Sequence, residues 1–212
     1  MLKVIFLAIT LFSLVLFYYG TGKQNKILII SILWLIIIGR VAYVGYFENT
    51  SITPPRFLFV PIAAISLAIY FYKIINKNKI STTFLVAIHI LRLPIELVLY
   101  KLFLQKQVPV LMTFKGWNFD ILIGVSAIFI LVYLLLTKKK LHKYFLWLWN
   151  SVGLIFLAII VILATLSSPT PIQQFAFEQP NVAVLQFPFI YLPALVVPLV
   201  FLSHILAIKQ AD

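Results

Sequence analysis

Residues 119–140 read FDILIGVSAIFILVYLLLTKKK, a long apolar run that ends in three lysines. No charged residue lies between Asp120 and Lys138, and a helix needs ~20 apolar residues to cross the hydrocarbon of a bilayer. Lysines at the end of such a run are typical of loops that stay on the cytoplasmic side. The stretch therefore predicts a transmembrane helix at Phe119–Thr137.

The composition of the whole chain agrees with that prediction. Hydrophobic residues make up 63% and charged residues 10% of the 212 residues, against ~45–50% and ~25% in soluble domains. Cutting the sequence at its polar interruptions leaves about seven apolar segments of membrane-spanning length. We therefore predict an all-α, polytopic transmembrane helix bundle that forms one domain over residues 1–212. The predicted helices are Leu2–Tyr19, Ile27–Phe47, Arg56–Tyr72, Ile80–Leu104, Phe119–Thr137, Tyr144–Leu166 and Val182–Ile208.

The basic residues indicate how these helices are oriented. Ten of the 17 lysines and arginines lie in alternate connections or near the C-terminus, which is the asymmetry that membrane insertion produces. We therefore predict an external N-terminus and a cytoplasmic C-terminus. The alternative is that the first apolar segment is a cleaved signal peptide. The net charge of +12 is divided among several connections, so it forms no patch that suits nucleic acid.

The segment Ile80–Leu104 carries the most informative polar side chains. They recur at intervals of three or four residues and so share one face of a helix: His89, Arg92, Glu96 and Tyr100. Pro94 has no amide hydrogen for the carbonyl of Ile90, which predicts a kink. A charge inside the membrane is costly and marks a functional site by default. The alternative is an ion pair within the helix, between Arg92 and Glu96.

Arg40 and Asp120 supply further charges at a similar predicted depth. Arg40 lies ~20 Å and Arg92 ~18 Å from the cytoplasmic ends of their helices at ~1.5 Å per residue. We expect these two arginines to converge with Glu96 and Asp120 below the outer surface. Arginine suits carboxylate and phosphate groups, so the set predicts a site for a small polar or anionic solute or a lipid headgroup. The alternative is that the charges only neutralise one another.

The connection between the last two predicted helices, residues 168–181, is rich in amides and aromatic residues and holds no lysine or arginine. Its prolines restrict the backbone. We expect it to fold over the mouth of the bundle with polar side chains turned inward, among them Gln174, Glu178 and Asn181. The alternative is an ordered outer turn. The last predicted helix contains three further prolines, so we expect it to be kinked or partly unwound.

Three stretches resemble small multi-pass bacterial membrane proteins that have no assigned activity: Met112–Leu122, Pro169–Leu185 and Arg92–Glu96. The resemblance implies a location in the bacterial inner (cytoplasmic) membrane. It transfers no catalytic or binding role to any residue.

Several other classes of function lack the residues that they need. The chain has no cysteine, which excludes a thiol nucleophile and cysteine metal sites. We expect His89 and His204 at different depths, and therefore predict no metal site and no cofactor. A retinal protein needs a lysine deep in the last helix, where the sequence offers only Lys209, near the cytoplasmic end.

Three classes of function stay open. The first is a sensor or transporter-like protein that binds a small polar or anionic solute or a lipid headgroup. The second is a structural subunit whose charges pair with a membrane-protein partner, and the third is an intramembrane enzyme that uses Glu96 or Asp120 as a proton carrier. The residues predicted to bind the ligand are Arg40, Arg92, Glu96, Asn118, Asp120, Gln174, Glu178 and Asn181.

Overall fold

The computed structural model describes residues 1–50 and 52–211. All regular secondary structure in this part of the chain is helical, as predicted. Seven of its helical segments are long and apolar enough to cross a membrane, which makes the protein polytopic. The predicted ends agree with these spans within four residues, except at the start of the last one. The spans are Leu2–Gly20, Asn25–Tyr43, Arg56–Ile74, Thr82–Leu104, Asp120–Thr137, Lys143–Leu166 and Leu192–Gln210.

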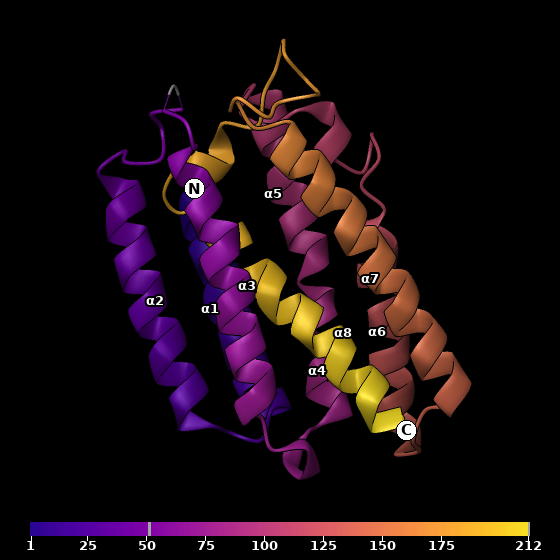
Figure 1. Cartoon of the computed structure of the whole chain (residues 1–212). Helices are drawn as coiled ribbons and strands as arrows, with labels where there is room; N and C mark the ends of the chain where they lie inside the picture. The colour runs from indigo at the N-terminus through magenta and orange to yellow at the C-terminus, as the bar shows by residue number, and fades with distance from the viewer. Residues whose placement is uncertain (51, 212) are drawn as a thin grey trace.

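The helices pack in two groups around the last one. Figure 1 shows α1, α2 and α3 on one side and α4 to α7 on the other, with α8 running obliquely between them. A continuous buried apolar core includes side chains from both groups and from α8. The elements are α1 (Leu2–Gly20), α2 (Asn25–Tyr43), η1 (Arg56–Leu58), α3 (Phe59–Ile74), η2 (Lys77–Lys79), α4 (Thr82–Ile90), α5 (Arg92–Leu104), η3 (Val110–Met112), α6 (Asp120–Thr137), α7 (Lys143–Leu166), η4 (Ala183–Leu185), η5 (Leu192–Val196) and α8 (Val197–Ala211).

The two ends of the bundle differ in charge. The N- and C-termini lie at opposite ends (Figure 1), and the connections that contain Lys23, Lys77 and Lys138–Lys140 lie at the C-terminal end. Residues 167–182 lie at the other end, which we call the loop end. Most of the lysines therefore lie at one end of the bundle. Which side of a membrane that end faces stays a prediction.

The segment predicted as one kinked helix, Ile80–Leu104, consists of two helices. α4 ends at Ile90 and α5 begins at Arg92, with Leu91 between them. Pro94 lies in the first turn of α5, where its missing amide hydrogen costs least, because the first residues of a helix have no partner within it. The predicted kink is thereby confirmed. The break places Arg92 at the start of a helix inside the bundle.

The last predicted helix, Val182–Ile208, is regular only in its second half. The short helix η4 and the π-helical stretch η5 precede α8. Prolines cannot donate to the preceding turn. The predicted start at Val182 is therefore wrong, and the expected unwinding is confirmed.

Side chains of α2 pack against this irregular backbone. Trp34 Nε1 donates to the carbonyl oxygen of Ala194 at 2.9 Å. Pro198, four residues further on, has no N–H to offer that carbonyl. Tyr191 Oη donates to the carbonyl oxygen of Leu35 at 3.0 Å. Irregular backbone at membrane depth requires such enclosure by protein, and α2 provides it.

Candidate functional site

Two oppositely charged side chains meet inside the bundle where α5 and α6 begin. Arg92 is the first residue of α5 and Asp120 the first residue of α6; they are 2% and 7% exposed. Arg92 Nη1 donates to Asp120 Oδ1, which forms an ion pair. The N-terminal end of α6 also places the positive end of its helix dipole beside the carboxylate. The pair joins α5 to α6.

Glu96 does not form an ion pair with Arg92, so the alternative of an ion pair within the helix is wrong. Glu96 Oε1 instead accepts a hydrogen bond from Asn118 Nδ2. The same nitrogen donates to the carbonyl oxygen of Met112 at 3.0 Å, and Asn118 Oδ1 accepts from the backbone nitrogen of Asp120 at 3.1 Å. One amide side chain therefore holds the segment before α6 against α5 and fixes the position of Asp120.

Arg92 also contacts His204 of α8. Arg92 Nη2 lies 2.9 Å from His204 Nε2, and His204 Nδ1 lies 2.7 Å from Asn150 Oδ1 of α7. Asn150 Nδ2 donates to the carbonyl oxygen of Leu146 at 2.7 Å, so Asn150 Oδ1 faces the imidazole as an acceptor. Because a guanidinium can only donate, Nε2 must accept and Nδ1 must carry the proton. His204 is therefore neutral, and it links Arg92 to Asn150.

His89 of α4 stacks against His204. The ring centroids are 3.9 Å apart with the planes at 21°, and the ring of Trp149 packs edge-on at 5.2 Å from His89. The prediction that the two histidines lie at different depths is wrong. It assumed helices that stand upright, whereas α8 crosses the bundle obliquely (Figure 1). Even so, the described residues contain no group of three or more side chains arranged to hold a metal ion.

Several buried polar atoms around Arg92 have no hydrogen-bond partner among the described residues. They are both ring nitrogens of His89, Nε of Arg92 and Oε2 of Glu96. Such an atom costs about 1–3 kcal/mol, and roughly nine in ten buried polar atoms in folded proteins are paired. Their concentration at one place makes this the candidate functional site. The charged cluster, as we call it, consists of His89, Arg92, Glu96, Asn118, Asp120, Asn150 and His204.

Three members of the charged cluster, His89, Asn150 and His204, were not predicted as ligand-binding residues. Each is a polar residue inside an apolar span, which was the signal that the sequence offered. A second signal is Gly153, one turn after Asn150, because a Cβ at this position would overlap the imidazole of His204. The absence of a side chain at Gly153 lets α8 approach α7 closely.

Half of the predicted site residues lie outside the cluster. Arg40 is exposed on α2, and α2 packs against α1 and η5. The predicted convergence of Arg40 with Arg92 is therefore wrong, because similar depth does not place two helices side by side. Gln174 and Glu178 are exposed in the connection at the loop end, whereas Asn181 is buried there. Ligand binding by any of these residues stays a prediction.

The connection at the loop end is tied to the rest of the bundle. Gln179 Nε2 donates to the carbonyl oxygens of Phe103 and Val108, at 3.0 and 2.7 Å. Asn181 Nδ2 donates to the carbonyl oxygen of Ala164 at 3.2 Å. These bonds support the alternative of an ordered turn.

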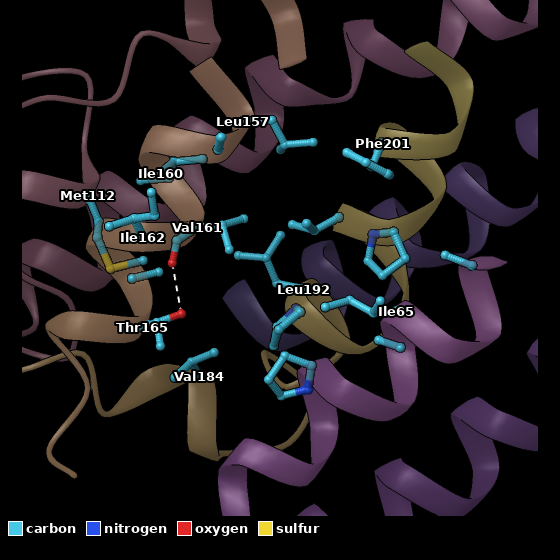
Figure 2. A pocket seen from close by; sticks show the side chains of 18 of the residues that line it. Ile65, Met112, Leu157, Ile160, Val161, Ile162, Thr165, Val184, Leu192 and Phe201 are labelled. Atoms are coloured by element: carbon cyan, nitrogen blue, oxygen red, sulfur yellow. Dashed lines mark hydrogen bonds between the residues drawn. The ribbon is translucent and has the colours of Figure 1, made fainter. Parts of the chain in front are cut away.

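A large apolar cavity, of about 620 Å³, lies between α3 and α7. Figure 2 shows Ile65 of α3, Leu157 of α7 and Phe201 of α8 around the same space. Further walls come from α5 and η5. The polar residues of its lining are Tyr72, Thr165 and Asn181. Thr165 and Asn181 lie at the loop end, and Tyr72 lies in the last turn of α3, near the opposite end. The cavity is therefore apolar along its middle and has polar groups near both ends.

Comparison with known proteins places this chain in a family. The family model of a domain of unknown function, DUF8737, matches residues 56–211. The chain belongs to this family. The match runs from η1 to α8 and includes the entire charged cluster. No curated protein and no solved structure matches the chain.

Proposed function

We propose that the protein binds an amphipathic, lipid-like molecule whose apolar part occupies the cavity between α3 and α7. The observation that carries the proposal is the cavity itself. Its volume of about 620 Å³ falls within the ~300–1,000 Å³ of small-molecule sites.

Polar groups at the loop end supply selectivity in this proposal. Lipid tails are as apolar as the cavity walls, so apolar contact alone does not favour one ligand over bulk lipid. Thr165 and Asn181 line the cavity near the end of α7. Thr165 Oγ1 donates to the carbonyl oxygen of Val161 at 2.8 Å, and its lone pairs remain available as acceptors. We assign the headgroup of the ligand to these two side chains.

The proposal also sets an orientation. The lysine-rich end faces the cytoplasm, by the positive-inside rule, and the loop end faces the outside of a bacterial inner membrane. The ligand then comes from the outer leaflet. The chain works as one domain, as a sensor or transporter-like protein.

The charged cluster supports the wall of the cavity. Leu157 lies one turn beyond Gly153 on α7, and Phe201 lies one turn before His204 on α8. A ligand that separates α7 from α8 therefore acts on the hydrogen bond between Asn150 and His204. This bond couples the cavity to the cluster in the proposed function.

Filling the cavity with a side chain tests the proposal. Ala158 lines the cavity from α7, whereas Ile155 of the same helix is 57% exposed and does not line it. We expect the wild-type protein and Ile155→Trp to retain a lipid of one class in native mass spectra recorded from mild detergent. Ala158→Trp loses most of that lipid. Equal retention by Ala158→Trp and the wild type overturns the proposal.

A second candidate function is proton transfer at the charged cluster, and the unpartnered Oε2 of Glu96 favours it. Intramembrane carboxylates commonly serve as proton relays. Glu96→Gln keeps the Oε1 acceptor for Asn118 and removes the group that carries the proton. The test is proton flux into dye-loaded liposomes that contain the protein. A flux that is abolished by Glu96→Gln and unchanged by Ala158→Trp supports this candidate over the first.

A further inference from the structure

A second groove, of about 640 Å³, lies between α1 and α5. Lys3 of α1 and Lys101 of α5 both line it. Gln105 and Gln107, which follow Lys101 at the loop end, add amide side chains to the same lining. These four side chains form the polar part of the groove.

Lys3 and Lys101 make the lining of the groove cationic. Both are exposed, and the part of the chain that the structure describes shows no ion pair for either one. The residues that line the groove include no aspartate or glutamate. Two like charges on one groove repel each other, so an anion that binds between them relieves the repulsion. Lysine is a common ligand of phosphate groups.

The groove is apolar on the side of the lysines that faces the middle of the bundle. Ile5 of α1 is 38% and Leu97 of α5 is 60% exposed, and both line it. A free anion gains only the contact with the lysines, whereas a phospholipid also lays its acyl chain along these side chains. Basic pockets between transmembrane helices on the cytoplasmic side of membranes bind anionic lipid headgroups, and the same chemistry applies to a basic groove at the loop end.

We propose that the groove between α1 and α5 binds an anionic phospholipid. Lys3 and Lys101 contact its phosphate, Gln105 and Gln107 hydrogen-bond the polar remainder of the headgroup, and the acyl chain lies on Ile5 and Leu97. This site adjoins the cavity between α3 and α7, because Leu102 and Phe189 line both, but different side chains bind the headgroup.

The test is a lipid titration of the purified full-length protein followed by native mass spectrometry. The wild type is expected to bind phosphatidylglycerol more tightly than phosphatidylcholine. Each lysine near an anionic headgroup contributes about fivefold in affinity, so Lys3→Gln with Lys101→Gln lowers binding of phosphatidylglycerol about 25-fold. Binding of phosphatidylcholine falls much less, because its choline cation offsets the charge of its phosphate.

Lys106→Gln is the matched control, because Lys106 is exposed just after α5 but does not line the groove. It changes the affinity for phosphatidylglycerol less than twofold. If the double variant does not fold, each single variant is expected to lose about fivefold. A double variant that keeps the lipid preference overturns the proposal. So does displacement of phosphatidylglycerol by millimolar inorganic phosphate, which identifies the site as one for a free anion.

Discussion

Replacement of Arg92 by methionine removes the cation at the centre of the charged cluster. Asp120 then keeps a buried carboxylate without its ion-pair partner, and His204 Nε2 loses its donor. Breaking a buried pair from one side costs ~3–5 kcal/mol, because the remaining charge is uncompensated. We therefore expect Arg92→Met to lower the free energy of unfolding by about 3–5 kcal/mol. Arg40→Met, at an exposed position of α2, changes it by about 0.5 kcal/mol or less.

A double-mutant cycle separates the ion pair from other effects of Arg92→Met. Asp120→Asn removes the carboxylate charge and keeps the side-chain shape. In the double variant neither charge is left without a partner. Its loss of unfolding free energy is therefore smaller than the sum of the losses in the two single variants, by about 1–3 kcal/mol. Unfolding in mixed micelles with increasing SDS, followed by helical circular dichroism, measures all four proteins. The ion pair is refuted if the losses of unfolding free energy add within about 0.5 kcal/mol. It is also refuted if Arg40→Met and Arg92→Met lower the free energy of unfolding equally.

Three further predictions concern topology and packing. A reporter fused at Lys140 is expected to report the cytoplasm and one fused at Glu178 the exterior; the reverse result overturns the orientation. Gly153→Ala is expected to destabilise by about 1–3 kcal/mol, because the new Cβ overlaps the ring of His204; an unchanged unfolding midpoint contradicts this packing. Asn150→Ala is expected to cost about 1–3 kcal/mol, because it leaves a buried N–H of His204 unpaired; a neutral effect refutes this hydrogen bond.

The spans of this fold are predictable because their length is set by the bilayer. Each of the seven spans corresponds to a predicted segment of apolar residues near the length that crosses a bilayer. Pro94 correctly indicated the break between α4 and α5. The start of α8 was not predictable in the same way. Residues 182–191 are as apolar as a membrane-spanning helix, so hydropathy does not show that the regular helix begins after them. The spacing of the prolines is the one signal in the sequence that the backbone before α8 is irregular.

The candidate site was predictable only in part. Arg92, Glu96 and Asp120 were expected to converge, because a charge inside an apolar span needs a partner. Which partner each one takes depends on how the helices tilt and pack, and no spacing along a single helix contains that information. Asp120 rather than Glu96 therefore meets Arg92. His204 reaches Arg92 from α8, 112 residues away along the chain.

Photo-crosslinking inside native membranes tests the proposed lipid-like ligand most directly. Ile65 lines the cavity and is 60% exposed, whereas Ile36 of α2 is 61% exposed and does not line it. A benzophenone side chain at each position compares the cavity with an equally exposed surface. The account predicts that adducts at position 65 are dominated by one lipid class, while those at position 36 follow the bulk lipid composition. Identical lipid adducts at both positions, or a protein adduct at position 65, would contradict it.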